Sequence, residues 1–308
     1  LAISASALVL SMSGCQSDLL DTQPTESFSG EAVWKSAVPA RAAVSGVYNE
    51  LYEKFSKNYN GSSVGMPMDA WSSVMEIDKN WINNCFVTTG SCTPSTNKVA
   101  DVYKYYYTMV YRANDVINNI DKVPDMEDAE KSKLKSECKF LRAWAYMYLN
   151  VFWHGVPLYT ENVDNDKATK PRASEKEVWD QVLKDLTDCI NDHNLPGKYA
   201  KGDSQYGHVT KGAAYAYRGQ VYQFLGDYSK ALADFEAVGK LGYALFTPSN
   251  GAKGNDDFFH LFKPANEQCD EMIFTVQCIQ TTNMGNPRAI NYGNRTTGGS
   301  AWNNYIPN

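Results

Sequence analysis

The chain has 308 residues, a formal net charge of −6 at pH 7 and a hydrophobic fraction of 43%. This length suits one large domain or two modest ones, and the hydrophobic fraction is sufficient for a packed core. Nucleic-acid binding depends on clustered lysines and arginines. Because the chain is acidic and has no lysine or arginine run longer than two, we expect no nucleic-acid partner.

The N-terminal stretch has the character of an export signal. Residues 1–14 are uncharged and rich in small and aliphatic side chains, which suits the apolar core of a signal better than a membrane-spanning helix. The small residues before Cys15 resemble a bacterial lipobox, with Met12 in place of the usual Leu. We therefore predict a lipoprotein signal peptide over 1–14 whose front end is missing, lipidation of Cys15, and a lipid-anchored tether over 15–30. An ordinary signal followed by an unrelated cysteine, or a buried N-terminal helix, is the alternative.

Helical periodicity dominates the chain as far as residue 240. Apolar side chains recur every three or four positions over 44–55 and 99–120, the spacing of one helix face, and Pro124 ends the second segment. Segment 127–152 contains CKFLRAWAYMYLNVF, a stretch that is apolar almost all round, which predicts a helix buried on several sides. Aromatic residues in the predicted helices are expected to pack in the core: Trp34, Tyr103, Tyr106, Trp144, Tyr146, Tyr148 and Trp179.

The next predicted helix begins with a capping box, in which Ser174 caps the helix and Glu177 follows three residues later. By contrast, segment 71–97 has little periodicity and many Asn, Ser, Thr and Gly residues, a pattern typical of a long loop. After Lys240 the helical pattern ends, and EMIFTVQCI at 271–279 predicts a short strand.

Segment 211–240 matches a tetratricopeptide repeat, with Arg218 where the repeat usually has Leu. The matching residues are Tyr215, Gly219, Tyr222, Gly226, Tyr228, Ala231 and Phe235. We predict two packed antiparallel helices that are broken near Gly226. A solitary pair leaves its own face uncovered, so the earlier helices must stack on it. The predicted fold is therefore mainly α, with tetratricopeptide-like helix pairs forming a frame, long irregular loops and few short strands.

Besides Cys15, six cysteines remain, and the sequence leaves their disulfide state open. Cys85 and Cys92 are close enough in sequence to close a small loop, whereas Cys138 and Cys189 lie on apolar helix faces, where a buried free thiol is expected. The other two are Cys269 and Cys278. No C-x-x-C pair occurs, so a zinc site has no support.

Four stretches occur together in a characteristic order: SDLLDTQPTESFSGEAVW at 17–34, SECKFLRAW at 136–144, GVPLYTENV at 155–163, and VTKGAAYAYRGQVYQFLGDYSKALADFEAV at 209–238. Together they resemble the SusD/RagB family of Bacteroidetes outer-membrane lipoproteins. Trp153-His154 departs from the Tyr-Gly that is usual before GVPL. Family members are commonly longer, so the resemblance implies a SusD-like helical domain over 31–308 that is incomplete at its C-terminus.

The resemblance also implies a location and partners. It implies a surface-exposed lipoprotein, held in the outer membrane by its lipid anchor, that covers a SusC-like TonB-dependent transporter. Such a protein hands nutrient to the transporter, most often an oligosaccharide. A peptide-binding nutrient receptor, or a tetratricopeptide-type interaction scaffold without sugar binding, is the alternative.

The sequence has no local catalytic motif, and it leaves open a carboxylate pair for glycoside hydrolysis, whose two members can be far apart in the chain. The four histidines, at positions 154, 193, 208 and 260, have no metalloprotease spacing, and no nucleophile elbow, phosphate-binding loop or dinucleotide fingerprint occurs. The acidic pair around Asn165 could suggest calcium, but such a pair in a loop is usually only solvated. We expect a protein that is not an enzyme and that needs no cofactor or metal.

Aromatic and amide residues in the aperiodic segments are the candidate sugar ligands. A flat ring can cover the apolar C–H face of a sugar, while amides and a guanidinium bond its hydroxyls. Each tryptophan could instead pack its loop onto the helices. The candidates are Trp71, Trp81, Asn83, Asn84, Tyr292, Asn294, Arg295, Trp302 and Tyr305.

Overall fold

The described part of the chain is mainly helical, as predicted. The computed structural model describes residues 30–56, 75–77, 93, 97–163, 169–247, 260–277 and 305–307. Its α-helices are α1 (Ala37–Ser56), α4 (Asn97–Asn119), α5 (Asp128–Trp153), α6 (Glu175–Asn191), α7 (Lys211–Phe224) and α8 (Tyr228–Lys240). The shorter elements are the 3-10 helices η2 (Gly30–Lys35), η3 (Ile120–Lys122) and η5 (Pro264–Asn266) and the strands β1 (Met75–Ile77) and β2 (Tyr305–Pro307).

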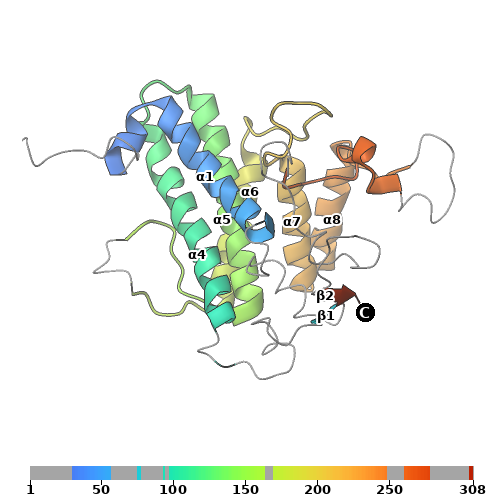
Figure 1. Cartoon of the computed structure of the whole chain (residues 1–308), viewed down its shortest axis with the longest axis horizontal. Coiled ribbons are helices and arrows are strands. Elements are labelled where there is room, and N and C mark those ends of the chain that lie inside the picture. Colours follow the sequence, from blue (N-terminus) through green and yellow to red (C-terminus); the bar gives the residue numbers. More distant parts are fainter. Residues whose placement is uncertain are drawn as a thin grey trace, which may run out of the picture.

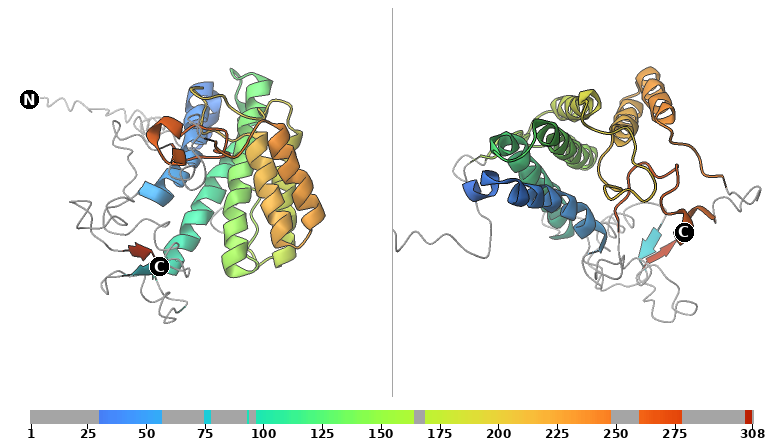
Figure 2. Two further views of the ribbon diagram at one scale, coloured as in Figure 1. Left: turned by 90° about the vertical axis from the view of Figure 1, so that its right-hand side faces the viewer. Right: turned by 90° about the horizontal axis from the view of Figure 1, so that it is seen from above.

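The helices pack in chain order. α4 packs on α5, α5 on α6, α6 on α7 and α7 on α8, while α1 lies against α4. Figure 1 shows the helices side by side, and the view from above in Figure 2 shows them arranged along a curve. In tetratricopeptide-type arrays each helix pair covers the face that its neighbour exposes. The arrangement therefore confirms that the earlier helices stack on the predicted repeat.

Aromatic side chains fill much of the core. Tyr106 is fully buried and stacks on Tyr148 with ring centroids 5.5 Å apart, and Trp144 contacts both rings. The other rings assigned to the core are also there: Trp34, Tyr146 and Trp179 are buried, and Tyr103 is partly buried against the same cluster. Their packing role is confirmed.

Helix α5 ends in a left-handed turn. His154 has a φ of 51°, and Gly155 follows with a φ of 90°. A Cβ atom on residue 155 would lie 2.6 Å from the Ala173 carbonyl oxygen, so glycine is required there for both its conformation and its small size. His154 occupies a conformation that favours glycine, the residue that the family resemblance leads one to expect at this position.

The predicted capping box of α6 is present. The backbone N–H of Glu177 donates to the Ser174 hydroxyl at 3.2 Å, and the Ser174 N–H donates to the Glu177 carboxylate at 2.7 Å. The Ser174 hydroxyl also donates to this carboxylate at 2.6 Å, and the two hydrogen bonds that the carboxylate accepts from Ser174 lower the pKa of Glu177. Two N–H groups at the start of the helix, which have no partner within the helix itself, are thereby satisfied.

Helices α7 and α8 form the predicted pair, with the break at Gly226, whose φ is 79°. A Cβ atom on Gly219 would lie 2.7 Å from the Phe235 ring, so the small residue allows the two helices to approach closely. Arg218, at the position where the repeat usually has Leu, donates to both carboxylate oxygens of Asp234 at 2.8 and 2.7 Å. An ion pair between the two helices thus stands in place of an apolar contact.

The prediction of a strand at 271–279 is wrong for the residues that the structure describes. Residues 271–277 form no strand, because no neighbouring strand pairs with them within the described ranges. Their apolar side chains are used differently: Ile273, Phe274 and Val276 pack on the helical core. Phe140 of α5 contacts the Phe274 ring edge-on at 5.1 Å. The segment is therefore an irregular cover over the helices.

The thiols of Cys138 and Cys189 are buried and free, as predicted, and Cys269 is also free. Burial raises the pKa of both buried thiols well above the usual value. The proposed pair Cys85 and Cys92 lies outside the described residues.

Candidate functional site

Most of the predicted ligand residues lie outside the part of the chain that the structure describes. These are Trp71, Trp81, Asn83, Asn84, Tyr292, Asn294, Arg295 and Trp302, and Cys15 lies outside it too. Tyr305 is the first residue of β2, and only its backbone is described. Their roles therefore stay predictions.

The two short strands nevertheless connect the predicted site segments. β1 and β2 pair antiparallel, with Met75 opposite Pro307 and Ile77 opposite Tyr305. In the sequence Trp71 and Trp81 flank β1, and Trp302 closely precedes β2. The backbone pairing thus joins two distant parts of the chain, and each has predicted ligand residues close by in the sequence.

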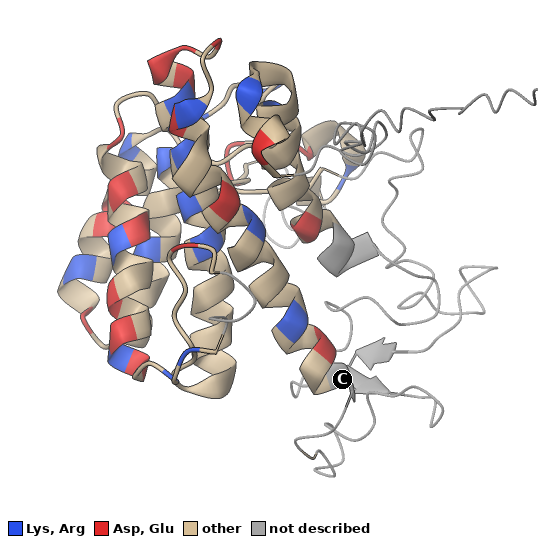
Figure 3. Ribbon diagram, turned by 90° about the vertical axis from the view of Figure 1, so that its left-hand side faces the viewer, with Lys and Arg blue, Asp and Glu red and all other residues tan. Residues whose placement is uncertain are grey.

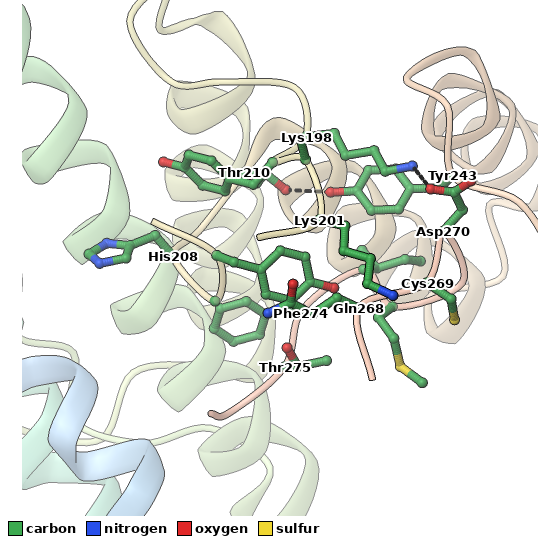
Figure 4. A pocket seen from close by; sticks show the side chains of 16 residues that line it. Lys198, Lys201, His208, Thr210, Tyr243, Gln268, Cys269, Asp270, Phe274 and Thr275 are labelled. Atoms are coloured by element: carbon green, nitrogen blue, oxygen red, sulfur yellow. Dashed lines mark hydrogen bonds and ion pairs between the residues drawn. The ribbon is translucent and has the colours of Figure 1, made fainter. Parts of the chain in front are cut away.

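The structure also contains a cavity that the sequence did not reveal. It has a volume of about 430 Å³ and lies between the connection from α6 to α7 and the segment 268–275. We call it the connection cavity. Figure 4 shows its polar and aromatic lining, which includes Lys198, Tyr199, Lys201, Tyr206, His208, Thr210, Tyr243, Gln268, Asp270, Phe274 and Thr275.

Two lysines bring positive charge to the connection cavity. Lys198 forms an ion pair with Asp270 at 2.5 Å and lies over the Tyr243 ring, 4.9 Å from its centroid. Lys201 donates to the backbone carbonyl of Ala265 at 2.9 Å. Within the described residues, no carboxylate lies within ion-pair distance of Lys201. One cation at the cavity is thus neutralised by a partner and the other is not.

The hydroxyl groups of the cavity differ in their hydrogen bonding. Thr210 and Tyr243 share a hydrogen bond of 3.0 Å. The hydroxyl of Tyr206 is buried and has no hydrogen-bond partner among the described residues, and burial raises the pKa of this phenol. Most buried polar groups in folded proteins are satisfied, so such a group requires an explanation.

A second cavity, of about 560 Å³, adjoins the connection cavity. It shares Tyr206, Gly207, His208 and Thr275 with the connection cavity and is otherwise lined mainly by α1. Gly207 has a φ of 100°, and a Cβ atom there would lie 2.9 Å from the Gln277 side chain. The close approach at Gly207 brings the connection from α6 to α7 against segment 271–277 and so separates the two cavities.

A buried carboxylate holds the connection from α6 to α7 in place. Glu137 of α5 has no exposed side-chain surface; it accepts a hydrogen bond from Tyr48 of α1 at 2.8 Å, and His208 Nδ1 lies 2.9 Å from the same oxygen. The Tyr48 hydroxyl in turn accepts the Val209 N–H at 2.9 Å. Burial and the nearby Glu137 raise the pKa of Tyr48 well above its usual value. Three segments of the chain therefore meet at one carboxylate.

The face of the molecule in Figure 3 carries intermingled acidic and basic residues on its helices. Where the structure describes the chain, no group of three or more metal-ligating side chains is found. No described helix is both long enough and apolar enough to cross a bilayer.

The chain matches the model of a known family. A SusD-like family model, described as "Starch-binding associating with outer membrane", matches residues 18–223. The chain therefore belongs to the SusD-like family, as the four sequence stretches predicted.

Three relatives illustrate the similarity. A SusD-like protein of Formosa agariphila is 28% identical over 71% of this chain and 41% of its own length. A SusD-like carbohydrate-binding protein of Bacteroides fragilis is 20% identical with a TM-score of 0.76, over 90% of this chain and 52% of its own. A surface glycan-binding protein of Bacteroides thetaiotaomicron, solved with laminarihexaose, is 21% identical with a TM-score of 0.61, over 76% and 48%. The chain spans about half the length of these relatives.

Proposed function

We propose that the protein captures oligosaccharides at the outer-membrane surface and delivers them to a SusC-like TonB-dependent transporter. The observation that carries the proposal is the family match over residues 18–223. It is supported by the helical fold shared with a glycan-binding protein that was solved with laminarihexaose. The role is binding and transfer rather than catalysis, since the sequence has no catalytic motif.

The segments next to β1 and β2 are the proposed capture site. A tryptophan that stacks on a sugar and covers on the order of 100 Å² of apolar surface contributes ~2.5 kcal/mol. Sugar hydroxyls mostly exchange hydrogen bonds with water for hydrogen bonds with protein, at a net gain of ~0.5–1.5 kcal/mol each. A single stacked ring therefore supplies a large share of the affinity, and Trp81 and Trp302 are the best candidates for it.

The test is calorimetric titration of Trp81→Ala and Trp302→Ala with laminarihexaose and a panel of other oligosaccharides. Loss of the stacking ring should weaken binding by roughly a hundredfold while the melting temperature barely moves. Trp179→Ala is the matched control, because Trp179 is buried in the core. Its truncation should lower stability by ~3–5 kcal/mol and leave the affinity of the folded molecules unchanged.

Parental affinity in both loop variants would show that these rings are not the capture site. If the parent protein bound no oligosaccharide but retained peptides from a mixed pool, the peptide-receptor alternative would replace the glycan proposal.

A further inference from the structure

We propose that the connection cavity is a second carbohydrate site, and that it takes a pyranose carrying one carboxylate group, a uronic acid. This inference rests on the proposed function, because it takes the natural ligand to be a glycan. The proposed site uses none of the loop tryptophans and so differs from the capture site in its chemistry. The volume of the connection cavity, about 430 Å³, lies within the ~300–1,000 Å³ of typical small-molecule pockets.

The cavity is separate from the β1–β2 segments. The connection that leads into α7 lies near the N-terminal end of that helix, and Figure 1 and the left view of Figure 2 both show β1 and β2 toward its other end. A sugar residue in the connection cavity therefore occupies a different place from one held beside the strands.

Charge selects an anionic ligand. The Lys198–Asp270 pair is neutral as a unit, whereas Lys201 has a neutral carbonyl as its acceptor. A carboxylate bound beside Lys201 would form a charge-assisted hydrogen bond, which is roughly twice as strong as a neutral one. A single uncompensated cation matches one carboxylate on the ligand.

The remaining lining suits a sugar ring rather than a simple anion. In Figure 4 the side chains of Lys201, Phe274 and Thr275 all lie below the Thr210–Tyr243 hydrogen bond. Phe274 adds an apolar ring to the lining, and Gln268, whose Oε1 accepts the Gly202 N–H at 2.7 Å, adds its amide NH₂ group. Tyr206 contributes a buried hydroxyl that no described residue satisfies. A ligand hydroxyl would supply a hydrogen-bond partner for this phenol.

The probes are glucuronate and galacturonate, each compared with its own methyl ester. The esters keep the ring and its hydroxyls but lose the charge. We expect at least one of the two acids to bind at least about tenfold more tightly than its own methyl ester. Calorimetric or NMR titrations measure the difference. Because Lys201 is exposed, this preference should shrink as salt is added.

Two variants assign the binding to this cavity. Lys201→Met should abolish the preference for the acid, while Lys230→Met, an exposed lysine of α8, should leave it intact. Tyr206→Phe removes the unsatisfied hydroxyl, so we expect affinity for the acid to fall about three- to tenfold without any drop in melting temperature. A purely structural tyrosine would not change affinity in a protein that melts normally.

Equal binding of acids and esters, or an unchanged acid preference in Lys201→Met, would overturn the inference. The proposed function has its own criterion, which is neutral-oligosaccharide binding that depends on the loop tryptophans. Neutral binding without any acid preference would therefore refute the second site alone, and absence of all sugar binding would refute both.

Discussion

At Glu137 a carboxylate with no exposed side-chain surface lies among the buried residues of α5. Burying a charge is costly unless it is paired and hydrogen-bonded. Here the Tyr48 hydroxyl and His208 provide contacts to one oxygen; Lys133 Nζ lies 3.7 Å from the other, which has no hydrogen-bond partner among the described residues. The charge in SECKFLRAW is visible in the sequence, but its partners lie 89 and 71 residues away. Sequence alone could therefore identify an unusual residue and could not identify what it binds.

Removal of the Tyr48 hydroxyl tests this cluster. Tyr48→Phe leaves the Glu137 oxygen with one hydrogen bond fewer and the Val209 N–H without its acceptor. The expected loss is ~1–3 kcal/mol, the usual penalty for an unsatisfied buried polar group, measured by urea unfolding. Tyr111→Phe is the control, because Tyr111 is 60% exposed and its change should be nearly neutral. An equal effect of the two substitutions would contradict the role assigned to Tyr48.

The elements that sequence predicted best are those whose signals are local. The capping box of α6 depends on Ser174 and Glu177 alone, and the α7–α8 pair depends on a spacing within 30 residues. The strand prediction failed over 271–277 because a short apolar run does not tell whether a partner strand is available. The connection cavity was missed for a related reason, since Lys201 and Phe274 come together only in three dimensions.

The close contact of α7 with α8 gives a prediction at the level of the helix pair. Ala231 is only 3% exposed, so Ala231→Trp should overfill the contact and cost ~1–3 kcal/mol. Ala233→Trp introduces the same ring at an exposed position of the same helix and should have little effect. Thermal and urea unfolding of both variants measure the difference. Similar stabilities for both would show that the helix pair packs more loosely than described.

For the whole molecule, the proposed surface role depends on an anchor at Cys15. In the organism that makes the protein, the precursor should incorporate labelled fatty acid, and Cys15→Ala should not. Each buried CH₂ of an acyl chain contributes ~0.8 kcal/mol, and stable anchoring requires more than one chain. Because Cys15→Ala removes the acylated residue, the variant should also leave the membrane fraction. Equal labelling of both proteins would disprove the anchor.

The order of the helices along the array has a consequence for folding. Because consecutive helices contact one another, most of the core forms from segments that are close in sequence, and loop closure among them is fast. The β1–β2 pair is one exception, since it joins residues 75–77 to residues 305–307. Chains that emerge from the ribosome or an export channel start at the N-terminus. The helical frame can thus assemble progressively, whereas the pairing that unites the two tryptophan-bearing segments must wait until both strands are present.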